Sequence, residues 1–138
     1  MSKYKDDFIS TLETEGLKYR ELDDRVVEIR FGGDNLSTIR ILVFFSKDGA
    51  GYAQLAGMEI CSFKDNELAA GLITCNEMNQ KYRWVKFYLD KDQDLTVSAD
   101  AILDINSAGK ECLELVLRLV HIIDESYVDF MRAKLLGN

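Results

Sequence analysis

The segment at residues 75–90 reads C-N-E-M-N-Q-K-Y-R-W-V-K-F-Y-L-D, and it indicates more about the fold than any other stretch. Its first half has the pattern of the end of a helix, and its second half alternates as a strand does. The strand places Val85, Phe87 and Leu89 on one face and Trp84, Lys86 and Tyr88 on the other. A surface strand with one buried face does not need aromatic residues on both sides. The second face is therefore expected to have a partner.

Length and composition predict one domain that spans residues 1–138. The chain has 138 residues, of which 47% are hydrophobic and 30% charged, as is usual for a globular protein. No apolar run approaches the roughly 20 residues that cross a bilayer, and the N-terminus lacks the apolar core of a signal peptide. We therefore expect a cytoplasmic protein that does not bind membranes.

The charge balance argues against nucleic acid as a partner. Asp and Glu number 24 against 17 Lys and Arg, which gives a formal net charge of −7. An acidic surface repels phosphate backbones unless its basic residues cluster, and the sequence contains no basic run. No glycine-rich phosphate loop leads from a strand into a helix, so we expect no nucleotide cofactor.

The cysteines and aspartates do not form a recognisable metal site. Cys61, Cys75 and Cys112 are widely separated, whereas structural zinc needs four ligands in closely spaced pairs. Cys75 and Cys112 fall at apolar positions of expected helices, where a free thiol packs as a small hydrophobe. Asp90-x-Asp92-x-Asp94 opens like a calcium loop, but the glycine and glutamate that such a loop also requires are absent. We expect a solvated hairpin tip and no metal.

The hydrophobic periodicity predicts helices at 3–15, 65–81 and 107–136, and strands at 17–22, 25–31, 37–46, 52–60, 83–90 and 95–102. Gly16 is expected to end the first helix, and Ser62 or Asp65 to cap the second. Leu68, Leu72, Cys75, Asn76 and Asn79 form the predicted inner stripe of that second helix. In the last helix we expect a break or bend near Ser126.

This order of elements predicts an α+β fold with a single domain. Helix, three or four strands, helix, two strands and helix follow one another, and short polar turns such as residues 32–35 and 47–51 connect the strands. Strands linked by hairpins favour an antiparallel sheet of five to six strands, with the three helices over one face.

Together with this order, particular residues resemble the YbjN family of small bacterial proteins, often labelled sensory transduction regulators. The residues that carry the resemblance are N-E-M-N-Q-K-Y-R-W-V-K-F-Y-L-D at 76–90, R-F-G-G-D-N at 30–35, the I-L-V-F-F strand from Ile41, and the start of the last helix after Leu103 and Asp104. The resemblance implies a fold similar to the chaperones of type III secretion systems. Those chaperones are small, acidic and usually dimeric, bind extended client segments, and use no cofactor. It implies no catalytic residues.

One candidate binding site follows from the strand pattern. If helices cover Ile41, Val43, Val85 and Phe87, then the opposite face of the sheet carries the side chains of Leu42, Phe44, Trp84 and Tyr88, interleaved with Arg30, Arg40 and Lys86. Aromatic and cationic side chains dominate binding hot spots, so this face is the predicted partner surface. The alternative is that the last helix folds over the face and buries it as core.

The predicted function is a non-enzymatic protein-interaction or chaperone-like regulatory module that binds a protein partner or client and forms a homodimer. The alternative is a small-molecule-sensing regulator with an apolar pocket between the sheet and the last helix. His121 has no acidic or thiol partner nearby in the sequence, and no convergent set of titratable residues indicates an enzyme.

Overall fold

The structure, a computed structural model, describes residues 2–136. Along the chain it contains α1 (Lys3–Thr14), β1 (Arg20–Glu21), β2 (Val26–Phe31), β3 (Ile39–Phe45), β4 (Tyr52–Gly57), the short 3-10 helix η1 (Asp65–Glu67), α2 (Leu68–Lys81), β5 (Lys86–Leu89), β6 (Leu95–Ile102) and α3 (Ala108–Leu136). The predicted α+β fold, with three α-helices and an antiparallel sheet of six strands, is confirmed.

The six strands form one sheet in the order β1-β2-β3-β4-β6-β5, and every neighbouring pair is antiparallel. The first four strands follow one another as hairpins. After α2 the chain returns as β5, which lies at the far edge, and β6 then fills the place between β4 and β5. The register places Val43 opposite both Val27 and Leu55, and Leu55 opposite Ala99. These residues lie on one face and are at most 5% exposed.

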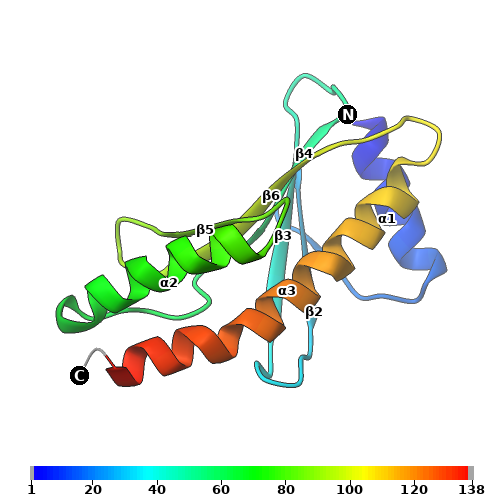
Figure 1. Cartoon of the computed structure of the whole chain (residues 1–138). Helices are drawn as coiled ribbons and strands as arrows, with labels where there is room; N and C mark the ends of the chain where they lie inside the picture. Colours follow the sequence, from blue (N-terminus) through cyan, green and yellow to red (C-terminus); the bar gives the residue numbers. More distant parts are fainter. Residues whose placement is uncertain (1, 137–138) are drawn as a thin grey trace.

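All three α-helices cover this inner face. Figure 1 shows α2 and α3 side by side along the sheet, with α1 against the beginning of α3. Phe8 of α1 packs on Phe45 of β3 with ring centroids 5.9 Å apart, and Phe130 of α3 stacks on Phe87 of β5 at 5.8 Å. The helices and the sheet thus share a single apolar core.

Gly109 brings the first and last helices into close contact. A Cβ atom at Gly109 would lie 2.2 Å from the hydroxyl of Thr11 and 2.4 Å from the carbonyl oxygen of Asp7. Glycine lets the backbones of α1 and α3 approach at this point, where any side chain would push them apart. The N-terminal helix is therefore fixed to the start of the last one.

The second helix differs from its prediction in two respects. Neither Ser62 nor Asp65 caps it: the segment opens with η1, whose N-cap is Lys64, and the Glu67 carboxylate accepts the Lys64 N–H at 2.8 Å. The predicted inner stripe is also partly wrong, because Leu72, Asn76 and Asn79 are exposed. Gly71 instead faces Phe63, so the helix is rotated toward its small residues; its buried positions are Gly71, Thr74, Cys75 and Met78.

The last helix runs from Ala108 to Leu136 without interruption, so the expected break near Ser126 is wrong. Ser126 is buried, and its hydroxyl donates to the carbonyl oxygen of Ile123 at 3.3 Å. The serine thus satisfies its hydroxyl within the helix and does not end it. The first strand is shorter than predicted, because only Arg20 and Glu21 pair with β2.

Candidate functional site

The outer face of the sheet, which we call the open face, carries the side chains that point away from the three helices. Its residues follow from the register, since successive strand residues alternate between faces. Val26, Phe44, Gln54 and Asp100 form one row across the sheet, and Glu28, Leu42, Ala56, Ser98 and Lys86 form the next. The last helix packs on the other face, where Ile123 contacts Gly57 and Ile41 lies beside them. The alternative in which α3 covers this face is therefore wrong.

The five residues predicted for the site divide into a floor and an exposed rim. Leu42 is 6% exposed and Phe44 is half-buried, so both form part of the floor. Trp84 and Tyr88 are each 37% exposed, and Lys86 is exposed between them. The Lys86 ammonium lies 5.2 Å from the centre of the Tyr88 ring, which is within the range of a cation–π contact.

Trp84 is held in an unusual conformation. Its φ is 77°, a left-handed value that bulky residues rarely adopt, and its indole Nε1 donates to the carbonyl oxygen of Asp100 at 3.2 Å. The backbone cost of such a conformation is about 1 kcal/mol or more. Because this hydrogen bond crosses to β6, the indole is fixed beside the strand pair and does not move freely in solvent.

Two neighbouring residues of the open face did not emerge from the sequence. Tyr52 and Ile102 lie opposite each other at the ends of β4 and β6, and they are 59% and 83% exposed. With Phe44 they line a shallow depression of about 520 Å³, which Arg25 and Asp100 flank. The alternating pattern of each strand contained this signal, but only the β4–β6 pairing brings the two side chains together.

A second feature of the open face is a group of three arginines around one buried carboxylate. Glu28 is 3% exposed; Arg40 Nε lies 2.6 Å from its Oε2, and Arg30 Nε lies 3.2 Å from its Oε1. Arg20 adds a third guanidinium at 3.8 Å. The Arg40 hydrogen bond lowers the pKa of Glu28 below the ordinary value of 4.5, outweighing the effect of burial. Glu28 is thus ionised at neutral pH.

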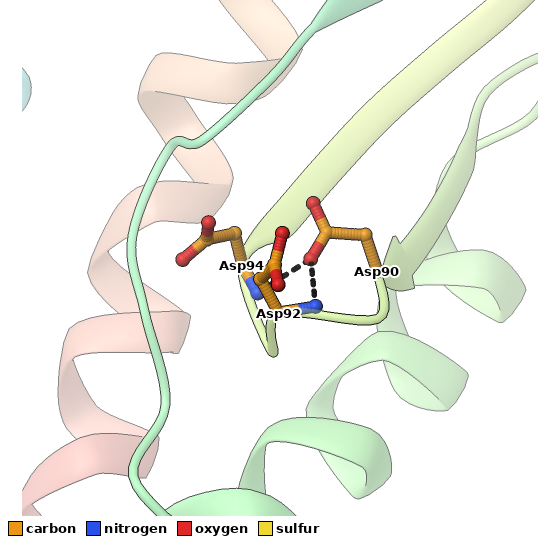
Figure 2. A group of neighbouring side chains, drawn as sticks. All are labelled: Asp90, Asp92 and Asp94. Atoms are coloured by element: carbon orange, nitrogen blue, oxygen red, sulfur yellow. Dashed lines mark hydrogen bonds between the residues drawn. The ribbon is translucent and has the colours of Figure 1, made fainter.

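The hairpin between β5 and β6 brings three carboxylates together (Figure 2). Oxygens of Asp90, Asp92 and Asp94 lie within 4.8 Å of one another. One oxygen of Asp90 accepts the backbone N–H groups of Asp92 and Asp94, at 2.8 and 3.1 Å, and Asp94 also accepts the Ser62 hydroxyl. These bonds shape the turn, as expected for a hairpin tip.

The glycine-rich turn at 32–35 is fixed by a carboxylate from the last helix. Asp124 accepts backbone N–H groups from Asp34, Asn35 and Leu36 at 2.9 to 3.1 Å. Burial alone would raise the pKa of Asp124, but these three hydrogen bonds together lower it below the ordinary value. The turn is therefore bound to α3, about 90 residues further along the sequence.

His121 has a partner that the sequence analysis missed. Its Nε2 lies 3.2 Å from Glu125, one helical turn further along α3, and Glu125 also accepts the Tyr82 hydroxyl at 2.6 Å. His121 and Glu125 are exposed on the surface of α3, and Tyr82 is half-buried beside them. Both Cys75 and Cys112 are buried as predicted, and burial raises their thiol pKa values, to about 11 and about 12.

The space between the sheet and α3 is filled by side chains such as Val43, Leu119 and Ile123, which are at most 1% exposed. No observation on residues 2–136 favours the alternative of a small-molecule pocket there. Among the helices of the described residues, none has the length and apolar character that a membrane span needs.

Comparison with solved structures identifies proteins of similar fold. YbjN from E. coli, described as a putative transcription regulator, matches with a TM-score of 0.64 and 12% identity, over 90% of this chain and 91% of that chain. An uncharacterized protein from Methanothermobacter thermautotrophicus matches with a TM-score of 0.57 and 12% identity, over 95% and 99%. At these identities the likeness concerns the fold alone.

The expected likeness to a protein of a type III secretion system is also found. The heterodimeric complex ExoU-SpcU from Pseudomonas aeruginosa contains a chain that matches with a TM-score of 0.45 and 16% identity, over 82% of this chain and 94% of that chain. No curated protein matches the sequence.

The family comparison covers nearly the whole chain. Residues 5–132 match the family YbjN, described as "Putative bacterial sensory transduction regulator". The match includes every strand of the sheet and all but the ends of α1 and α3. The chain therefore belongs to the YbjN family.

Proposed function

We propose that the chain is a non-enzymatic regulatory module that binds a protein partner on its open face. The observation that carries the proposal is the exposure of large side chains on a sheet face that no helix of residues 2–136 covers. The side chains of Trp84, Tyr88, Tyr52 and Ile102 are aromatic or aliphatic, and all are more than a third exposed. Apolar groups gathered on one face of a folded protein are typical of an interface.

The geometry of Trp84 supports the same proposal. A left-handed backbone and a hydrogen bond to Asp100 fix the indole at the surface, where it contributes less to the core than a buried tryptophan would. Strain of this kind is tolerated most often at binding and catalytic sites. A fixed indole also loses little conformational entropy when a partner covers it.

The experiment replaces Trp84 and Tyr88 together by serine. The variant should retain the fold and lose no more than about 2 kcal/mol of stability per substitution, because both side chains are partly exposed already. Proteins that the immobilised wild-type chain retains from its native cell should no longer bind. The matched control replaces Leu72 and Ile73 of α2, which are equally apolar, more exposed, and distant from the open face.

Two results would contradict the proposal. The first is a double variant that unfolds, which would assign Trp84 and Tyr88 to the stability of the monomer. The second is a double variant that retains the same partners as the wild type and the control. Homodimerisation and the cytoplasmic location stay predictions; light scattering of the purified protein tests the former. A thermal-shift screen with metabolites tests the small-molecule alternative.

A further inference from the structure

We propose that the partner of the open face is a protein segment that carries carboxylate side chains close to a large apolar side chain, and that Arg20, Arg30 and Arg40 receive those carboxylates. This inference rests on the proposed function and specifies the chemistry of the partner. It follows from three features. The arginine group carries more positive charge than Glu28 neutralises, and the open face is positive whereas the whole chain is negative. The apolar depression also lies at a fixed distance from the arginines.

The arginine group has more positive charge than its own carboxylate neutralises. Arg30 and Arg40 are directly opposite each other on β2 and β3, an arrangement that like charges disfavour. Glu28 lies between them and offsets part of this repulsion. Three guanidiniums share that one carboxylate, and each has five N–H donors. Arg20 and Arg30 have side chains that are 70% and 58% exposed, so their remaining donors are accessible to a partner.

The open face is opposite in sign to the rest of the protein. Its strands carry four cations, Arg20, Arg30, Arg40 and Lys86, and two anions, Glu28 and Asp100. The face therefore has a net charge of +2, whereas the whole chain has −7. A second copy docked through the same face would oppose two positive surfaces. Charge complementarity favours an acidic segment of a different protein instead.

The apolar depression lies at a fixed distance from the arginines. Arg40, Leu42 and Phe44 follow one another on the open face of β3, and Phe44 lines the depression. At about 3.3 Å per residue, Arg40 and Phe44 are about 13 Å apart along the strand. An extended partner segment would span that distance with about four residues. We therefore expect carboxylates at one end of the segment and a large aliphatic or aromatic side chain at the other.

The test selects ligands from a library of random ten-residue peptides displayed on phage, with the immobilised full-length chain as bait. The retained peptides should be enriched in Asp and Glu relative to the starting library, and should carry a large apolar residue several positions away. A retained peptide should bind Arg20→Gln and Arg30→Gln each about fivefold more weakly, as for the loss of one exposed ion pair. Its affinity should also fall as the NaCl concentration rises.

Matched variants separate this effect from changes in folding or in total charge. Neither Arg20→Gln nor Arg30→Gln disturbs the closest ion pair, Arg40 with Glu28, so both variants should fold. Arg118→Gln removes the same charge from an exposed position of α3 and should leave peptide binding unchanged. Glu28→Gln frees the arginines from their internal carboxylate. It should raise the affinity for an acidic peptide, with circular dichroism used to confirm the fold.

The outcomes distinguish the two proposals. Retained peptides that are neutral or basic, or that bind the arginine variants as well as the wild type, would overturn the acidic partner; their dependence on Trp84 and Tyr88 would still support the open face. If the wild-type bait retains no more peptide than a bait that carries both Trp84→Ser and Tyr88→Ser, the proposed function itself would be overturned. A dimer in light scattering that Arg30→Gln dissociates would identify a second copy as the occupant and overturn this inference.

Discussion

Among single residues, Asp124 links the turn between β2 and β3 to the last helix through hydrogen bonds to its oxygens. Its carboxylate accepts three backbone N–H groups of that turn, while the Asn35 amide donates to the Asp124 carbonyl oxygen at 3.2 Å. Gly33 makes this possible, because a Cβ atom there would lie 2.2 Å from Asp124 Oδ1 and 2.9 Å from the Leu36 carbonyl oxygen. One glycine and one aspartate thus fix the turn.

We predict that Gly33→Ala lowers the free energy of unfolding by about 2 kcal/mol, because the methyl group displaces the Asp124 carboxylate. Gly32→Ala is the control, since a Cβ atom there meets only the Ser37 carbonyl oxygen at an ordinary 3.5 Å. Urea denaturation measures both. In an Asp124→Ala background the cost of Gly33→Ala should shrink, and equal costs in the two backgrounds would refute the contact as the cause.

Among the elements, β5 has an outer edge that a side chain of α2 covers. Asn79 Oδ1 accepts the Phe87 N–H at 2.7 Å, and Asn79 Nδ2 donates to the Phe87 carbonyl oxygen at 3.0 Å. One amide therefore satisfies the donor and the acceptor that a further strand would otherwise pair. Such cover protects an edge strand from pairing with other chains.

We predict that Asn79→Ala costs about 1–2 kcal/mol, since it leaves two backbone groups of Phe87 without their partner. Asn76→Ala, at an exposed position of the same helix, should cost less than about 0.5 kcal/mol. Thermal unfolding followed by circular dichroism compares the two. The Phe87 amide should also exchange its hydrogen faster in the first variant only. Unchanged exchange at Phe87 would show that the amide bridge does not protect the edge.

The elements themselves could be predicted largely from the sequence, because period-two and helical patterns depend on neighbours along the chain. The positions that failed depend on contacts between distant segments. Leu72 fits an apolar stripe, yet Phe63 packs on Gly71 and so fixes which side of α2 faces inward. The alternation of each strand predicted Arg30 and Arg40 on the open face, but it could not predict that they meet on Glu28 or that Tyr52 pairs with Ile102. Both require a register across strands, and no pattern within a single strand specifies it.

At the scale of the whole molecule, several carboxylates stabilise the fold in their charged form. The pKa of Glu28 is lowered first by the Arg40 hydrogen bond, and that of Glu67 first by the Lys64 backbone N–H and then by Lys134. Against the opposing effect of burial, the three backbone N–H groups that donate to Asp124 lower its pKa as well. In the unfolded chain these groups bind protons at higher pH than in the fold. Their contribution is therefore complete above the ordinary values of 4.5 and 3.8, and is lost as the pH falls through the lower folded values.

We predict that the free energy of unfolding decreases steadily as the pH falls from about 5 to about 3. Urea denaturation at closely spaced pH values measures it. Glu28→Gln should be less stable than the wild type at neutral pH but should lose less on acidification, because one of the titrating groups is gone. If the free energy of unfolding of the wild type stays constant or rises as the pH falls over this interval, these carboxylates do not stabilise the fold through their charged form.

The strand order has a consequence for how the chain reaches this structure. Strands β1 to β4 pair with immediate neighbours, and so do β5 and β6, but β4 pairs with β6 across η1, α2 and β5. Loop-closure entropy makes such a distant pairing slower than the hairpins on either side. We therefore expect the β1–β4 hairpins and the β5–β6 hairpin to form early and independently, and the pairing of β4 with β6 to set the folding rate.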